Sequence, residues 1–302
     1  MSEQLLRLDH ITMQFGGVVA VDDLELVVNE GEIVALIGPN GAGKTTIFNL
    51  LTKVYQPTTG TVLLDGKDTH GMNTMQVNRA GIARTFQNIR LFTNMSVEDN
   101  VKCAMDASLH CSMAGSILRL PGFFREEKAA HDRAMELLEI FGMQDLADAK
   151  AGSLPYGAQR RLEIARALAT NPSLLLLDEP AAGLDPQGRR DIFGGIRAYN
   201  RETGSTVVIV SHSMEDMAQY CDDVAVMAHA RLLMTGTRDE VFARADELEA
   251  VGLDIPVITK LSALLRQGGL PLDPGLYTLE AAEAALAQVF GLPADREGGR
   301  KR

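Results

Sequence analysis

A glycine-rich loop near the start of the chain carries a lysine followed by two threonines. An apolar run at residues 33–37 precedes this loop, and a helical pattern at residues 46–51 follows it. The spacing G-x-x-x-x-G-K-[ST] between a strand and a helix is typical of a loop that binds phosphate groups. The loop consists of Gly38, Pro39, Asn40, Gly41, Ala42, Gly43, Lys44, Thr45 and Thr46.

The residue types in this loop suit a chain of phosphates. Glycines allow backbone N–H groups to turn inward around an anion. The N-terminus of the following helix adds partial positive charge. Lys44 can reach the outer phosphate oxygens, and the Thr45 hydroxyl can ligate Mg²⁺. We therefore expect this loop to bind a phosphate chain together with Mg²⁺.

Two carboxylates follow a second apolar run, at residues 174–177. An uninterrupted apolar run of this length is typical of a central parallel strand, and ligands bind at the carboxyl ends of such strands. Asp178 suits a contact to Mg²⁺, direct or through water. Glu179 suits a general base that activates a water molecule.

Polar or aromatic side chains end three further strand-like runs. Gln87 ends the run at residues 81–87 and could face a Mg²⁺ site or be a solvated strand end. His212 follows the buried run at 206–210, where it is either structural or a hydrogen-bond partner of a terminal phosphate. Phe15 precedes a Gly-Gly turn and is either a core residue or a ligand contact.

The surrounding pattern predicts an α/β protein. Residues 5–28 predict an antiparallel sheet beside the nucleotide-binding core, and a strong amphipathic helix is expected at 126–141. The apolar, loop-rich segment at 112–124 is either a partner-facing surface or local core. The remaining expected elements are strands at 61–64, 224–227 and 231–236, and helices at 160–168, 191–200, 238–242, 258–265 and 278–289.

Composition narrows the class of protein. The 302 residues are 46% hydrophobic and carry a net charge of −11, which argues against a nucleic-acid backbone as partner. The longest apolar runs have strand length, so the sequence predicts no membrane-spanning segment. Three cysteines without a C-x-x-C pair fit a reducing, cytoplasmic compartment.

Taken in order, these motifs resemble those of ATP-binding-cassette (ABC) ATPases, from residue 5 to about 236. The resemblance implies a P-loop NTPase core with an antiparallel β-subdomain, an α-helical subdomain at 88–153, and ATP and Mg²⁺ as cofactors. Residues 237–290 would form a small helical C-terminal extension that dimerises, and residues 291–302 a disordered tail.

The resemblance also implies roles for single residues. Phe15 stacks on adenine, and Asp185 touches the other ATPase subunit. Gln87 senses Mg²⁺ and the transmembrane partner, and His212 is the switch histidine. The predicted catalytic residues are Lys44, Gln87, Glu179 and His212, and the predicted metal ligands are Thr45, Gln87 and Asp178.

One motif departs from the family pattern. The signature loop usually reads Leu-Ser-Gly-Gly-Gln, and this chain has Leu154–Pro155–Tyr156–Gly157–Ala158. The serine hydroxyl that would bond a γ-phosphate is missing, but Leu154 and Gly157 remain as expected nucleotide contacts. In this family the signature loop of one subunit completes the ATP site of the other subunit. The altered signature loop of this chain would therefore affect the ATP site of the partner and not its own phosphate loop.

Two subfamilies are visible. Residues 5–185 resemble ATPases of branched-chain amino-acid importers, in runs such as 84–92 and 160–166. Residues 186–290 resemble ATPases of energy-coupling-factor importers, in runs such as 210–216 and 251–257. The chain therefore looks like a mosaic, natural or constructed.

The resemblance implies an ATP hydrolase subunit that energises a membrane importer. It would lie peripherally on the cytoplasmic face of the cell membrane, with a second ATPase subunit and integral permeases. The expected cargo is branched-chain amino acids, with vitamins or metal ions of an energy-coupling-factor system as the alternative. A non-transport cassette protein of DNA repair or ribosomes, and a regulatory subunit with little hydrolysis, are the other hypotheses.

Overall fold

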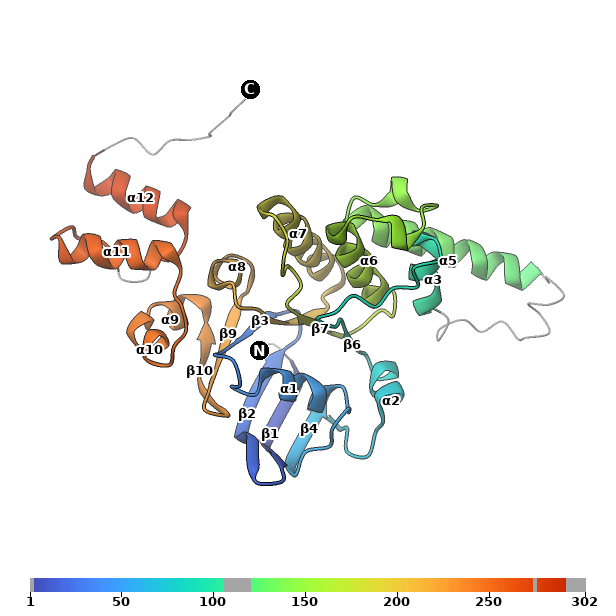
Figure 1. The fold of residues 1–302 in the computed structure, drawn as a ribbon, viewed down its shortest axis with the longest axis horizontal. Coiled ribbons are helices and arrows are strands. Elements are labelled where there is room, and N and C mark those ends of the chain that lie inside the picture. Colours follow the sequence, from blue (N-terminus) through green and yellow to red (C-terminus); the bar gives the residue numbers. More distant parts are fainter. Residues whose placement is uncertain (1–2, 106–120, 274–275, 292–302) are drawn as a thin grey trace.

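The computed structural model describes residues 3–105, 121–273 and 276–291, and within them the chain forms two sheets (Figure 1). The smaller sheet is antiparallel, with strand order β2-β1-β4-β5. The turn at Gly16–Gly17 joins its two long strands, as the sequence predicts. Its strands are β1 (Gln4–Phe15), β2 (Val18–Asn29), β4 (Thr59–Leu64) and β5 (Lys67–Asp68).

The larger sheet has the order β10-β9-β3-β8-β7-β6, and every neighbouring pair is parallel except β10 with β9. All residues of its three central strands are buried, because helices or the smaller sheet cover both faces. Its strands are β3 (Ile33–Ile37), β6 (Ile82–Arg84), β7 (Leu174–Asp178), β8 (Thr206–Val210), β9 (Asp223–Ala228) and β10 (Arg231–Thr237).

Helix α1 (Lys44–Leu51) packs between the two sheets. Ile47, Phe48 and Leu51 belong to one buried cluster with residues from both sheets. Helix α1 begins two residues earlier than the expected helix at 46–51, because the glycine before Lys44 takes a left-handed conformation that starts it. The loop in front of α1 therefore lies at the carboxyl end of β3.

A helical layer covers the opposite face of the larger sheet. The amphipathic helix expected at 126–141 is confirmed in α5 (Pro121–Ile140), whose apolar stripe is buried with that of α6. Most of the apolar segment predicted at 112–124 lies outside the described residues, and its last part begins α5. The other helices here are α3 (Val97–Met105), α6 (Tyr156–Leu168), α7 (Pro186–Thr203) and α8 (Met214–Tyr220).

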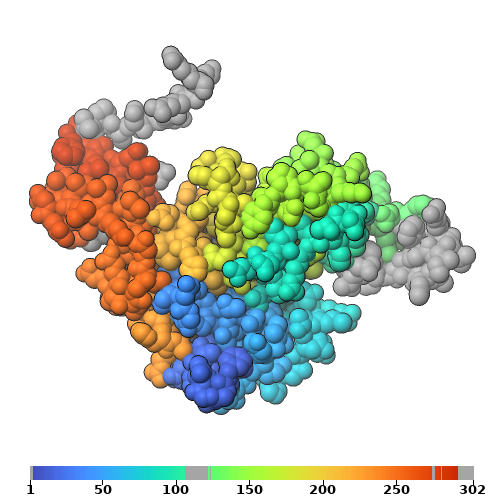
Figure 2. All heavy atoms as spheres, viewed as in Figure 1, coloured from blue at the N-terminus to red at the C-terminus, as the bar shows by residue number. Residues whose placement is uncertain are grey.

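Within the described residues, four helices follow the last strand and form a lobe on the side of the molecule opposite α3 and α5 (Figures 1 and 2). They are α9 (Arg238–Phe242), α10 (Ala245–Ala250), α11 (Val257–Gln267) and α12 (Leu279–Val289). The tail predicted at 291–302 lies outside the described residues except for its first glycine. None of the helices in the described parts of the chain combines the length and the apolar character needed to cross a membrane.

Some element predictions were wrong at their boundaries. The helix expected at 191–200 runs from Pro186 to Thr203, because Asp185 caps it and a proline suits its first turn. The strand expected at 81–87 ends at Arg84, so Gln87 lies three residues beyond it. Beyond Thr85, which still bonds to β7, the Phe86 carbonyl accepts from an arginine side chain instead of the sheet. Three short helices, α2 (Thr74–Arg79), α8 and α10, were not predicted.

Candidate functional site

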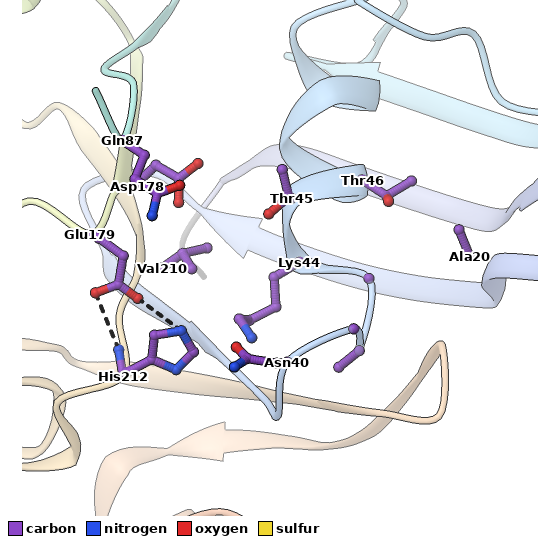
Figure 3. Close-up of a pocket in the computed structure, with 13 residues that line it drawn as sticks. Ala20, Asn40, Lys44, Thr45, Thr46, Gln87, Asp178, Glu179, Val210 and His212 are labelled. Atoms are coloured by element: carbon purple, nitrogen blue, oxygen red, sulfur yellow. Dashed lines mark hydrogen bonds and ion pairs between the residues drawn. The ribbon is translucent and has the colours of Figure 1, made fainter. Parts of the chain in front are cut away.

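A pocket of about 280 Å³ lies where the carboxyl ends of β3, β7 and β8 meet the N-terminus of α1 (Figure 3). It brings together the glycine-rich loop, the carboxylates at the end of β7 and the histidine after β8. Eleven of the residues predicted from sequence line it. The lining consists of Ala20, Asn40, Gly41, Ala42, Gly43, Lys44, Thr45, Thr46, Gln87, Asp178, Glu179, Val210 and His212.

Two glycines of the loop are held where other residues do not fit. Gly43 has φ +105°, and a Cβ there would lie 2.5 Å from the Ala20 carbonyl oxygen. A Cβ on Gly38 would lie 2.4 Å from the Met227 carbonyl oxygen. Because Gly43 precedes the first turn of α1, the free N–H groups of that turn open onto the pocket.

Lys44 points its ammonium group across the loop. Its Nζ donates hydrogen bonds to the carbonyl oxygens of Gly38 at 2.5 Å and Pro39 at 3.0 Å. Burial lowers the pKa of Lys44, while the negative charges of Glu179 and Asp178 act in the opposite direction. The loop thus presents a largely desolvated amine to any anion in the pocket.

Glu179 faces the pocket from an unusual backbone conformation. Its φ is +48°, and its N–H donates to the Val210 carbonyl at 2.9 Å, so the turn stays tied to β8. The carboxylate lies 3.4 Å from the His212 backbone N and from His212 Nε2 (Figure 3). It lies equally close, at 3.4 Å, to the Ser211 hydroxyl. Burial raises the pKa of Glu179, and His212 lowers it. The result is a carboxylate whose proton affinity exceeds that of an ordinary exposed glutamate.

Oxygen-bearing side chains gather on the other side of the pocket. Thr45, on α1, faces Asp178 and Gln87 (Figure 3). The described residues contain no cluster of three His, Cys, Asp or Glu side chains suited to a metal ion. A cation here would therefore take hydroxyl, amide, carboxylate and phosphate oxygens, which is the donor set that Mg²⁺ prefers. The residues present fit that ion.

The remaining predicted residues lie outside the pocket. Gly38 and Pro39 form the entry to the loop, and Leu154 is buried in the core. Phe15 is 42% exposed and stands edge-on to Tyr55, with ring centroids 5.1 Å apart.

Gly157 and Asp185 lie close to each other on a separate surface. A Cβ on Gly157 would lie 3.4 Å from Leu184 Cδ2, and one on Gly183 would lie 3.8 Å from Tyr156 Cε1. Asp185 accepts a hydrogen bond from the Gly188 N–H at the start of α7. We call residues 156–157 and 183–185 the signature face. It does not line the pocket of its own chain.

Sequence reasoning missed two polar partners of the site. Arg84 Nη2 donates to Asp178 Oδ2 at 3.1 Å, and both side chains are buried. Ser211 contacts the Glu179 carboxylate. An arginine within a short buried strand was the available signal for the first, because such a charge needs a carboxylate nearby.

Comparisons with known proteins agree with this geometry. The family described as ABC transporter matches residues 21–182. The chain is 40% identical over 250 residues to the high-affinity branched-chain amino acid transport ATP-binding protein BraF of Pseudomonas aeruginosa, covering 83% of this chain and 98% of that protein. It is 38% identical over 283 residues to the energy-coupling factor transporter ATP-binding protein EcfA2 of Symbiobacterium thermophilum, covering 92% and 91%.

Solved structures show the same fold. The ADP conformation of an ATP-binding cassette of an ABC transporter aligns with a TM-score of 0.71 at 30% identity, covering 83% of this chain and all of that one. A dimeric post-hydrolysis state of another ATP-binding cassette, bound to ADP and Pi, aligns with a TM-score of 0.66 at 26% identity, covering 78% and 99%.

Proposed function

Since the chain belongs to the ABC transporter family of ATP-binding proteins, we propose that it energises a membrane importer for branched-chain amino acids. Its relatives are transport ATPases, and the chain is an ATP-binding and ATP-hydrolysing subunit of that kind. The observation that carries the proposal is the meeting of the phosphate loop, Glu179 and His212 around one pocket.

The proposed hydrolysis relies on positioning and electrostatics, as phosphoryl transfer generally does. Lys44 and the loop N–H groups neutralise the phosphates. Glu179 takes a proton from the attacking water, which its raised pKa favours. His212 donates to the γ-phosphate. Bound Mg²⁺ would neutralise the phosphate oxygens further, and Thr45, Gln87 and Asp178 are the residues that would hold it.

The residues outside the pocket serve two other contacts in this proposal. Phe15 stacks on the adenine, which its exposed position at the end of β1 supports. Gly157 and Asp185 act at the nucleotide of a second ATPase subunit, whereas the side chain of Leu154 is buried in the core and leaves only its backbone for such a contact. ABC ATPases dimerise, as in the aligned post-hydrolysis cassette with ADP and Pi, and the exposed position of the signature face supports this contact.

The domain boundaries follow the same proposal. Residues 5–236 form the cassette, with residues 88–153 as its helical part, and residues 237–290 contribute to dimerisation. Exposed apolar side chains on the C-terminal helices support this contact. They are Val257, Leu261 and Leu264 of α11 and Leu279 and Val289 of α12, with Phe290 directly after α12. Relatives are ATPase subunits of membrane transporters, so we expect peripheral association with the cytoplasmic face of the membrane through permease subunits.

The relatives support two candidate cargoes. The branched-chain relative is covered almost entirely, over 98% of its length, which favours amino acids. The energy-coupling-factor relative aligns with more of this chain, 92% against 83%, and this favours vitamins or metal ions as the second candidate.

Affinity purification of the chain from membranes, with mass spectrometry of the integral proteins recovered, tests the proposal. We expect two multispan permeases of the amino-acid importer type. Recovery of an energy-coupling-factor transmembrane subunit would instead transfer the cargo to the second candidate. Recovery of ribosomes or DNA without any integral protein would contradict the transport function.

A further inference from the structure

Arg160 is a buried charged residue to which the proposed mechanism gives no role. It lies in the first turns of α6 and is 1% exposed. Its Nη1 donates to Glu163 Oε2 at 2.6 Å, and Glu163 is itself only 2% exposed. A buried ion pair of this kind is weak evidence for stability, because its desolvation cost offsets much of its attraction. The contacts of the guanidinium point to another role.

The other donors of Arg160 all bond to backbone carbonyls of the site. Nη2 donates to the Asp178 oxygen at 2.7 Å and to the Glu179 oxygen at 2.9 Å. Nε donates to the Pro180 oxygen at 3.2 Å, and Nη1 also donates to the Phe86 oxygen at 2.6 Å. Together with the ion pair, these bonds use all five N–H donors of a guanidinium.

These carbonyls belong to the two segments that carry the predicted reactive groups. Residues 178–180 form the turn in which Glu179 takes its left-handed conformation. Phe86 immediately precedes Gln87, which lines the pocket. Glu163 extends the same network, since its Oε1 accepts from the Arg90 N–H at 3.4 Å. One guanidinium therefore connects both sides of the pocket to α6.

The same helix begins at Tyr156, directly at the signature face. A rigid, planar guanidinium with five bonds in fixed directions transmits a displacement of α6 to both segments. A lysine offers three donors from a flexible stem and cannot span them all.

We infer that Arg160 is a positioning residue for ATP hydrolysis, which couples the signature-bearing helix to Glu179 and Gln87. The inference rests on the proposed hydrolytic function. Contact of the signature face with a second subunit would shift α6, and Arg160 would carry this shift to the carbonyls behind the general base. Hydrolysis in one site would thereby depend on the state of the same chain's signature face.

Two variants in the full-length chain, assembled with its membrane partners, test this role. Arg160→Lys keeps the positive charge opposite Glu163 but loses the planar guanidinium with its five N–H donors. The double variant Arg160→Met with Glu163→Met removes the bonds to the carbonyls. It leaves no buried unpaired charge, so we expect it to fold. Arg161→Lys is the matched control, because Arg161 bonds to Phe141 and Asp191 instead.

The readouts are kcat, KM for ATP and the unfolding midpoint. We expect kcat to fall about tenfold in Arg160→Lys and about hundredfold in the double variant, with KM within about twofold of the parent, since small misplacements at a reacting centre have effects of this size. Arg161→Lys should match the parent in all three.

Parent-like kcat in both variants would overturn the inference, as would a fall in kcat that matches the loss of folded protein or that the Arg161 control shares. A fall in kcat with unchanged KM and unchanged folding supports it. A parent chain that turns over no ATP would contradict the proposed function, and this inference with it.

Discussion

The pocket and the signature face differ in how completely their own chain supports them. In the pocket, buried strands end in Asp178 and Val210 side by side, and the polar groups that follow bond to one another and to the sheet. On the signature face, Tyr156 is 49% exposed and Asp185 is exposed, with its side chain bonded to the end of α7.

This difference separates residues that act within a single chain from residues that act only in contact with a second subunit. The pocket holds the groups for binding phosphates and for accepting a proton within a single chain. The signature face exposes Tyr156, Gly183 and Asp185, and none of its residues lines that pocket. Substitutions in the pocket should therefore change what the isolated chain does, whereas substitutions on the signature face should act only after assembly.

The largest effect on nucleotide affinity is expected for Lys44→Ala. Loss of the ammonium removes charge-assisted hydrogen bonds to phosphate, so the Kd for ATP of the isolated chain should rise about hundredfold. Titration with a fluorescent ATP analogue measures it. Lys67→Ala, at a lysine whose side chain is 79% exposed beside Asp65, is the control and should leave the Kd unchanged. A Kd of Lys44→Ala equal to that of the parent would contradict the assignment of this pocket as the ATP site.

Gly157→Asp should act only in the assembled complex. The added carboxylate would face the nucleotide of the second subunit, and turnover of the complex should fall about tenfold through charge repulsion. The Kd for ATP of the isolated chain should stay unchanged. In Gly157→Ala, the added Cβ meets only the end of the Leu184 side chain, so turnover should remain close to that of the parent. An altered Kd in the isolated aspartate variant would show that the signature face serves its own pocket.

His212→Ala should move the pH dependence of turnover. The ionised form of Glu179 is the base, so activity is lost as pH falls through its pKa. His212 lowers this pKa, and its removal should therefore shift the acidic limb to higher pH and reduce kcat about tenfold. The kcat–pH profile measures both effects, with His70→Ala as the control at an exposed histidine. A limb that stays in place would contradict the link between the two residues.

The smallest effect is expected for Asp185→Ala. Its carboxylate caps α7 through the Gly188 N–H, so the free energy of unfolding of the isolated chain should fall by about 1 kcal/mol. Asp185→Asn keeps a capping oxygen and should unfold like the parent. Urea denaturation of both variants decides this. Unchanged stability in the alanine variant would contradict a role of this cap in folding. Asp185 would then act only in the contact with a second subunit.

The sequence allowed much of the pocket to be predicted. Uninterrupted apolar runs identified β3, β7 and β8 as buried parallel strands, and parallel strands place the residues that follow them at one edge. Glu179 and His212 could therefore be expected to meet before any coordinates were known.

The connections behind the pocket could not be predicted in this way. Arg160 acts through backbone carbonyls, which every residue carries, so the residue types at 86 and 178–180 hold no signal for it. The start of α7 could have been predicted from the sequence, because an Asp-Pro pair is a helix start signal. The start of helix α10 could not be predicted in the same way, since its N-cap is Arg244 and no side chain caps it.

Glu179 should act as the general base for hydrolysis, whereas ATP binding should not depend on its carboxylate. Single-turnover hydrolysis and ATP affinity of Glu179→Gln, assembled with the membrane partners, test this most directly. We predict that the variant binds ATP like the parent and that its turnover falls about 10²–10⁴-fold, the usual contribution of a general base. Turnover within about twofold of the parent would contradict the assignment, because no proton acceptor would then be needed at this position.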